Sequence, residues 1–236
     1  MNVRRVALPL LLAVFVALPW KIVDVAAQMP KPPAGFTALF NGKDLTGWKG
    51  LVGNPRTRPT MTPEALAQAQ EKADAQMRAN WSVVNGELHY TGKGNSLCTE
   101  KQYSDFEFYV DWKIGPDADT GIYLRGTPQV QIWDPFNNPN LKNGEEKGSG
   151  GLWNNAKNPR DPLVMADNPI GQWNTFFIRM VGEKVWIDLN GKRVVDNVTL
   201  ENYWEKDKSI YAREQIELQH HGNPIYFRNI YIKELP

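Results

Sequence analysis

The ten residues DFEFYVDWKI (105–114) alternate between apolar and polar side chains without interruption. A period of two places successive side chains on opposite faces of a β-strand. The pattern therefore predicts a long strand that buries one face in a core. The polar face would carry Glu107, Tyr109, Asp111 and Lys113, and the core face Phe106, Phe108, Val110, Trp112 and Ile114.

Short segments of the same kind continue on both sides of this strand. Asn85-Gly86, between Trp81–Val84 and Glu87–Tyr90, is the strongest hairpin signal because this dipeptide suits a two-residue turn. Further strands are predicted at 175–180, 184–189, 193–195, 215–221 and 225–232. Short strands at this spacing predict an all-β fold, an antiparallel two-sheet sandwich.

One helical insertion is predicted at about residues 63–79. Thr62 can cap it, Pro63 suits the first helical position, and Glu64 complements the helix dipole. The residues that follow, as far as Arg78, are rich in Ala, Gln, Glu and Lys. The weakly apolar face predicts that this helix packs on the edge of the sandwich instead of forming its core.

The N-terminus has the layout of a secretory signal peptide. Arg4 and Arg5 precede an apolar run, and the small residues Val25-Ala26-Ala27 follow it. We predict a signal peptide at 1–27, a Pro-rich lead at 28–35, one sandwich domain at 36–236, and a periplasmic or extracellular location. The alternative is a membrane anchor, but Pro9 and Pro19 interrupt the run, so no stable membrane span is expected after cleavage.

Charge and cysteine content exclude several classes of partner. Removal of residues 1–27 leaves 24 basic and 25 acidic residues, and phosphate binding needs a clustered positive field. We therefore expect no nucleic acid partner. Cys98 is the only cysteine and the three histidines show no zinc spacing, so no cofactor and no metal ligands are predicted. A divalent metal requirement and the oligomeric state stay open.

A polar and aromatic face is predicted on GIYLRGTPQVQIWD (121–134). Its apolar set is Ile122, Leu124, Val130 and Ile132, and its other set is Tyr123, Arg125, Gln129, Gln131 and Trp133. In 215–221, Glu217, Gln219 and His221 alternate in the same way with Ile216 and Leu218. Large planar hydrogen-bonding groups beside aromatic rings favour a small carbohydrate as the ligand, whereas an ordinary half-solvated sheet is the alternative.

General acid–base chemistry needs proton carriers within reach of a substrate. If the two polar faces are continuous, Glu217 and His221 satisfy the residue-type requirement, with Asp111 from the strand 105–114 and Arg125 as further catalytic candidates. The candidates for substrate binding are Tyr123, Gln129, Gln131, Trp133, Gln219 and Trp153. Trp153 lies in the long segment Pro135–Gln172, which is predicted to fold over the sandwich as a wall of the site.

Residues 36–235 resemble the 3-keto-disaccharide hydrolase domain family, also described as 3-keto-glucoside 1,2-lyases and hydratases. The matching stretches are FTALFNGKDLTGW (36–48), WSVVNGEL (81–88), YSDFEFYVDW (103–112), TGIYLR (120–125), VQIWD (130–134), GQWN (171–174), LNG (189–191) and IELQHHGNPIYFRNIYIKE (216–234). The resemblance implies a concanavalin-like jelly-roll sandwich, an exported bacterial protein, and cleavage of glycosidic bonds in sugars oxidised at C3.

The implied reaction is removal of the C2 proton, β-elimination of the C1 oxygen, and addition of water. Glu217 and His221 suit proton transfer, while Arg125 and Gln131 suit stabilisation of the enolate. This chain has Pro128-Gln129-Val130-Gln131 where the family often has Tyr-Glu-Val-Gln, so Gln129 can bind hydroxyls but cannot act as a base. The competing hypotheses are a non-catalytic carbohydrate-binding module and a structural surface domain without a site.

Overall fold

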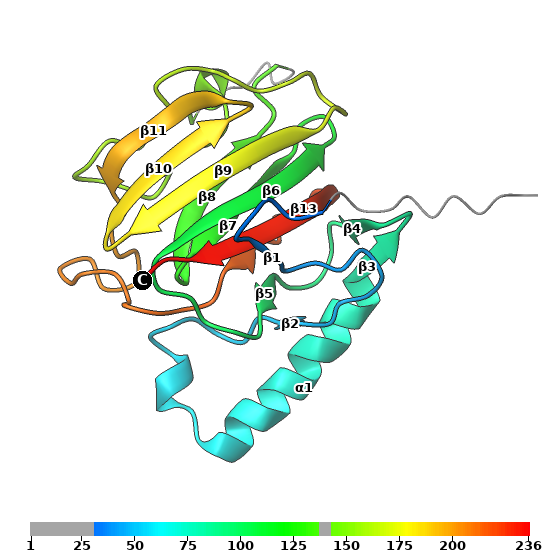
Figure 1. Ribbon diagram of the computed structural model, residues 1–236. Helices are drawn as coiled ribbons and strands as arrows, with labels where there is room; N and C mark the ends of the chain where they lie inside the picture. Colours follow the sequence, from blue (N-terminus) through cyan, green and yellow to red (C-terminus); the bar gives the residue numbers. More distant parts are fainter. Residues whose placement is uncertain (1–30, 137–142) are drawn as a thin grey trace, which may run out of the picture.

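A computed structural model describes residues 31–136 and 143–236. The predicted signal peptide and the first residues of the Pro-rich lead lie outside them. The described chain forms two antiparallel sheets packed face to face, with one long helix beside the smaller sheet (Figure 1). The predicted two-sheet sandwich of the concanavalin or jelly-roll type with one helical insertion is confirmed. No helix of residues 31–136 and 143–236 is long and apolar enough to cross a membrane.

The larger sheet has the strand order β11-β10-β9-β6-β13-β4-β3, and β1 pairs with β13. Its central strand β6 is the alternating segment from which the fold was predicted. The bounds are β1 (Thr37–Ala38), β3 (Trp81–Val84), β4 (Glu87–Tyr90), β6 (Phe106–Ile114), β9 (Asn174–Val181), β10 (Lys184–Leu189), β11 (Lys192–Thr199) and β13 (Ile225–Glu234).

The smaller sheet has the order β2-β5-β12-β7-β8. Its bounds are β2 (Trp48–Gly50), β5 (Leu97–Thr99), β7 (Asp119–Leu124), β8 (Thr127–Trp133) and β12 (Glu217–Leu218). The stretch 121–134 is thus a hairpin that turns at Arg125-Gly126, and only the centre of 215–221 is a strand. Two 3-10 turns complete the elements, η1 (Arg58–Thr60) and η2 (Glu145–Lys147).

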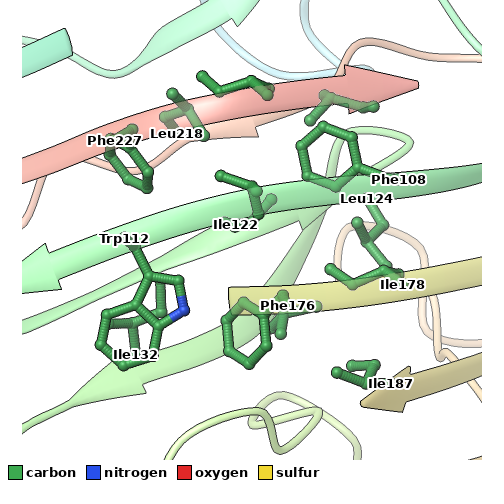
Figure 2. Close-up of a cluster of buried hydrophobic side chains, with 14 of the residues drawn as sticks. Phe108, Trp112, Ile122, Leu124, Ile132, Phe176, Ile178, Ile187, Leu218 and Phe227 are labelled. Atoms are coloured by element: carbon green, nitrogen blue, oxygen red, sulfur yellow. The ribbon is translucent and has the colours of Figure 1, made fainter. Parts of the chain in front are cut away.

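The core lies between the two sheets. Side chains of β6 and β9 point from the larger sheet toward those of β7, β8 and β12 in the smaller one (Figure 2). Phe108, Trp112, Ile122, Ile132 and Leu218 are all fully buried. Each such side chain contributes roughly 1.5–3 kcal/mol by burial, so this layer fixes the two sheets against each other and determines which side chains face outward.

The helix α1 (Pro63–Asn80) begins and ends close to its predicted bounds. The Thr62 hydroxyl accepts a hydrogen bond from the Ala65 amide at 3.2 Å, as an N-cap should. The C-terminal half of α1 is attached to β2, where the Gly50 amide donates a hydrogen bond to Asp74 Oδ1 at 2.9 Å. A Cβ at Gly50 would lie 2.2 Å from the Ala73 carbonyl oxygen, so only glycine permits this close approach.

Candidate active site

A cavity of about 460 Å³, called the polar cavity below, opens on the outer face of the smaller sheet. Its size is within the usual range of small-molecule sites. Hydrogen-bonding and aromatic side chains dominate its lining, which consists of Asp119, Tyr123, Pro128, Gln129, Gln131, Trp133, Asn143, Trp153, Asn154, Tyr203, Trp204, Gln219 and His221. Of the ten residues proposed from sequence, seven lie here: Tyr123, Gln129, Gln131, Trp133, Trp153, Gln219 and His221.

Strand pairing brings these side chains together. Within the hairpin Asp119 pairs with Trp133 and Gly121 with Gln131, while Tyr123 pairs with Glu217 on the neighbouring strand β12. Alternation then sends Asp119, Gly121 and Tyr123 to one face. Gly121 permits the close approach of β8, because a Cβ there would lie 2.8 Å from the Val130 carbonyl oxygen and 3.2 Å from the Gln129 side chain.

The floor of the polar cavity is a chain of amides that ends at a carboxylate. The Gln129 side-chain amide donates to the Gln131 carbonyl oxygen. Gln131 Nε2 in turn donates to Asp119 Oδ1 at 2.6 Å and to the Thr120 carbonyl oxygen at 3.0 Å. The donors of Gln131 are therefore already used, and its amide holds Asp119 in place.

Aromatic rings form the walls. Trp133 and Trp153 meet edge to face with centroids 5.2 Å apart, and Arg160 stacks on Trp153 at 4.1 Å. Tyr203 and Trp204 form a second edge-to-face pair at 4.9 Å. The segment 135–172 does supply a wall, as predicted, because Trp153 and Asn154 belong to it.

Gln219 presents an unused acceptor at this site. Its Nε2 lies 3.5 Å from the Tyr123 hydroxyl. Its Oε1 is buried and has no hydrogen-bond partner among the described residues. Burial raises the pKa of Tyr123 above its usual value, so the phenol keeps its proton. An unpaired buried acceptor beside a phenol that retains its donor suits recognition of hydroxyl groups.

His221 and Asp119 form a pair at the rim of the polar cavity. His221 Nδ1 lies 3.5 Å from Asp119 Oδ2, and both side chains are about half exposed. Burial raises the pKa of Asp119, partly offset by His221 and by the hydrogen bond from Gln131. A carboxylate on Nδ1 favours the tautomer that leaves the other ring nitrogen available as a base.

Glu217 is the most unusual ionisable group of the sheet. It is only 2% exposed, and its carboxyl group has no hydrogen-bond or ion-pair partner within residues 31–136 and 143–236. Burial raises the pKa of Glu217 to about 8; Arg58 lowers it and Glu214 raises it further. The carboxyl group, which is next to Tyr123 across the strands but does not itself line the polar cavity, therefore holds a proton at neutral pH.

The prediction that Asp111 joins this face is wrong. Asp111 lies on β6 in the larger sheet, whose outer face is on the opposite side of the sandwich. Its carboxylate accepts from Thr175 Oγ1 at 2.6 Å, from Asn229 Nδ2 at 2.7 Å and from Arg228 Nε at 3.2 Å. These three donors give Asp111 a structural role.

The expected place of Arg125 is also wrong, because this residue lies at the turn between β7 and β8 instead of continuing the alternation. Its guanidinium is buried, donates to the Ala212 carbonyl oxygen at 3.2 Å, and lies 3.8 Å from Asp105. It does not line the polar cavity. Arg125 thus lies outside the group of side chains that strand pairing brings together at the polar cavity.

Several lining residues were not predicted from sequence: Asp119, Asn143, Asn154, Tyr203 and Trp204. The sequence did indicate the direction of Asp119, since this residue stands two positions before Gly121 and four before Tyr123 in the same alternation. Tyr203 and Trp204 lie in a loop after β11, where no periodicity indicates direction. Trp204 is placed by its indole N–H, which donates to the Gly126 carbonyl oxygen at 2.7 Å.

No three His, Cys, Asp or Glu side chains are grouped as metal ligands in residues 31–136 and 143–236. Burial raises the pKa of Cys98 to about 12, so its thiol stays protonated and packs as a small side chain.

Comparison with known proteins identifies a family for this chain. The family model described as 3-keto-alpha-glucoside-1,2-lyase-like domain matches residues 35–233, which is most of the chain. The chain belongs to this family. A 3-keto-disaccharide hydrolase of Bacteroides thetaiotaomicron is 23% identical over an alignment that covers 88% of this chain and 81% of that protein.

Two solved structures from Parabacteroides distasonis, both named as candidate glycosyl hydrolases, share the fold of this 3-keto-alpha-glucoside-1,2-lyase-like domain. One has a TM-score of 0.64 and 26% identity, with 86% of this chain and 85% of that chain covered. The other has a TM-score of 0.58 and 22% identity, with 85% and 99% covered. The family and the sandwich were thus both predicted correctly from the sequence.

Proposed function

We propose that the protein cleaves the glycosidic bond of 3-keto-glycosides in the polar cavity. The observation that carries this proposal is a cavity of amides and aromatic rings that holds the Asp119–His221 pair, with the buried, protonated Glu217 paired to its lining residue Tyr123 across the strands. Family membership and the name of the Bacteroides relative support the same substrate class.

The first step uses the acidity that a C3 ketone gives to the C2 proton. His221, with Asp119 on its Nδ1, takes this proton, and the electron pair of the C2–H bond forms an enolate whose oxygen is the former C3 carbonyl. Tyr123 donates a hydrogen bond to that oxygen, because its raised pKa keeps the phenol protonated. Tyr123 thereby replaces Arg125 in the role predicted from sequence.

In the second step the enolate re-forms the ketone and its electron pair makes the C1–C2 double bond. The C1–O bond breaks, and the leaving oxygen takes the proton of Glu217. Water then adds across the enone: its oxygen bonds to C1, the proton that it loses returns to Glu217, and the proton held by His221 returns to C2. The sum is hydrolysis, with no net oxidation or reduction.

The order of these groups along the chain supports the assignment. Gln219 comes two residues after Glu217 and two before His221, and its Nε2 lies 3.5 Å from the Tyr123 hydroxyl. We propose that the sugar ring contacts Gln219 and Tyr123, with its C2 toward His221 and its glycosidic oxygen toward Glu217.

The test is incubation of the purified protein with 3-keto-trehalose, followed by a measurement of free glucose. Release of glucose with the unoxidised disaccharide unchanged supports the proposal. Saturable binding of the keto sugar without glucose release would instead support a non-catalytic carbohydrate-binding domain. Absence of both would reject a sugar site in the polar cavity.

Export is a separate part of the proposal. The Arg4-Arg5 start, the apolar run and Val25-Ala26-Ala27 support cleavage after Ala27. Expression in a bacterium with an intact secretion pathway, followed by mass spectrometry of the periplasmic protein, should give a mature N-terminus at Gln28. An uncleaved protein held in the membrane fraction would support the anchor alternative.

A further inference from the structure

The polar cavity extends along β7, and its two ends are differently lined. Asp119 and Tyr123 both line it and are four residues apart on this strand, about 13 Å. At one end, called the base end below, His221 Nδ1 lies 3.5 Å from Asp119 Oδ2. One six-membered ring spans less than the distance from Asp119 to Tyr123. The sugar whose C2 faces His221 therefore leaves part of the cavity free.

The other end lies at the turn between β7 and β8 and is called the turn end below. The mechanism does not use the three residues that line it, Pro128, Tyr203 and Trp204. The Trp204 indole N–H donates to the carbonyl oxygen of Gly126, in that turn, at 2.7 Å. Tyr203 meets Trp204 edge to face, with the ring centroids 4.9 Å apart. An aromatic pair thus stands over the end of the cavity that is remote from the base.

The loop that carries Tyr203 is fixed by its own hydrogen bonds. The Asn202 side chain is buried, and its Oδ1 accepts from the Trp204 amide at 3.0 Å and from the Glu205 amide at 2.9 Å. Its Nδ2 donates to the Ser209 carbonyl oxygen at 2.9 Å. Tyr203 lies between two of these fixed positions. Its ring is therefore in place before a ligand binds, and little conformational freedom is lost on binding.

The free surface of Tyr203 suits a neutral sugar. Its side chain is 42% exposed, and its hydroxyl has no hydrogen-bond partner among residues 31–136 and 143–236. An open aromatic face with a hydroxyl at its edge can hold the C–H face of a pyranose ring and one of its hydroxyl groups. Among the described lining residues, only Asp119 and His221 can carry a charge near neutral pH, and both are at the base end. A phosphorylated or acidic sugar would lack a partner for its charge at the turn end.

Strand pairing sets the direction of the substrate. The Gln219 amide donates to the Gly121 carbonyl oxygen at 2.9 Å, and Glu217 pairs with Tyr123, two residues further along β7. The segment from His221 back to Glu217 therefore runs from the base end toward the turn end. The proposed mechanism directs C2 toward His221 and the glycosidic oxygen toward Glu217. The group that leaves with this oxygen consequently lies at the turn end.

We propose that the turn end is the subsite for the leaving sugar, that this sugar is a neutral pyranose, and that Tyr203 selects it by stacking on its ring. The inference rests on the proposed function, which places the 3-keto ring against Gln219 and Tyr123. The second ring lies against Tyr203, with Pro128 and Trp204 beside it. Both rings of a disaccharide are thus held in one cavity, and a glycoside with a small leaving group gains nothing from the turn end.

The test compares 3-keto-trehalose with methyl 3-keto-glucoside, whose methoxy group is too small to reach Tyr203. Tyr203→Ala removes the ring and should raise KM for 3-keto-trehalose about 10-fold with kcat within about twofold, because stacking is present in the bound substrate as well as in the transition state. For methyl 3-keto-glucoside, KM should change less than about twofold. Where its turnover is slow, its inhibition constant against 3-keto-trehalose gives the same comparison.

Three variants are matched controls. Tyr203→Phe keeps the ring and should hold KM for 3-keto-trehalose within about threefold of the wild type. Lys206→Ala changes an exposed position of the same loop outside the polar cavity and should affect neither sugar. Trp153→Ala removes a ring at the base end, where Trp153 packs on Trp133, and should weaken both sugars alike.

The outcomes separate the subsite from the proposed function. If Tyr203→Ala weakens both sugars equally, or neither, the subsite is wrong, while turnover by the wild type keeps the proposed function. If Tyr203→Phe loses as much affinity as Tyr203→Ala, selection by ring stacking is wrong. If the wild type releases no glucose from 3-keto-trehalose, the proposed function fails and the subsite with it.

Discussion

Asp111 and Glu217 are acidic residues on the outer faces of the two sheets, and their surroundings differ completely. Asp111, on the larger sheet, is 8% exposed and accepts hydrogen bonds from Thr175, Arg228 and Asn229. Glu217, on the smaller sheet, is 2% exposed and has no such donor among the described residues. The Asp111 carboxylate is held by three hydrogen-bond donors, whereas burial without donors raises the pKa of Glu217 to about 8.

The presence or absence of hydrogen-bond donors around a buried carboxyl group distinguishes a structural role from a functional one better than the residue type does. A buried carboxylate with three donors holds strands together, since each donor favours the ion. A buried carboxyl group without donors destabilises the fold when it ionises, so its presence needs another reason. The proton donation that we propose for Glu217 would supply that reason.

The largest effect should come from Glu217→Gln. The amide keeps the shape of the side chain but cannot donate the proton, so kcat/KM for an aryl or disaccharide 3-keto-glycoside should fall about 10²–10⁴-fold. Steady-state kinetics measure this loss, and circular dichroism checks that the fold is kept. Asp111→Asn is the matched control and should retain kcat/KM per folded molecule. Equal activity losses in both variants would contradict the contrast between the two carboxylates.

Asp111→Ala should mainly lower the stability of the fold, whereas Glu217→Gln should mainly lower activity. Removal of the carboxylate leaves the Arg228, Asn229 and Thr175 donors without their acceptor, which should lower the free energy of unfolding by about 2 kcal/mol. Urea denaturation measures the change. Glu217→Gln should be as stable as the wild type or more so at pH 8. A stable Asp111→Ala variant with lost turnover would return Asp111 to the catalytic residues.

The fold was predictable because alternation alone reveals which side chains face a core. The strand 106–114 and the hairpin at Asn85-Gly86 appear where the pattern indicated. Sheet membership was not predictable, since it depends on which strands pair. For that reason Asp111 was placed with Glu217 although β6 and β12 belong to opposite sheets. Arg125 was misplaced because alternation does not continue through a turn.

The seven candidate residues that line the polar cavity lie on β7 and β8, in the segment around β12, or at Trp153. Glu217 itself was proposed, but its burial was not visible in the sequence. Arg58 and Glu214, which influence its pKa, are more than 150 residues apart in the chain. Such a pairing of distant segments leaves no local pattern that sequence reasoning could use.

The pH dependence of stability should distinguish the wild type from the Glu217→Gln variant. The pKa of Glu217 rises from 4.5 to about 8 in the folded protein. The folded state thus binds this proton more tightly, and the resulting stability is complete below pH 4.5 and is lost as the pH rises through about 8. The slope is at most about 1.4 kcal/mol per pH unit. Urea denaturation at pH 5, 6, 7 and 8 should show this loss in the wild type but not in Glu217→Gln. Parallel curves would mean that Glu217 is ionised at neutral pH.

The smallest effect should come from a variant of Gln219, the neighbour of Glu217 to which we assign contact with the ligand and no proton transfer. Its buried Oε1 has no partner in the described structure, so a substrate hydroxyl should satisfy it. Gln219→Met keeps the volume and removes the acceptor, which should raise KM about 10-fold with kcat within about threefold, because such a hydrogen bond contributes about 1.4 kcal/mol. Steady-state kinetics with methyl 3-keto-glucoside separate the two constants. A fall in kcat at constant KM would instead mean that Gln219 acts in the transition state and not only in binding of the ligand.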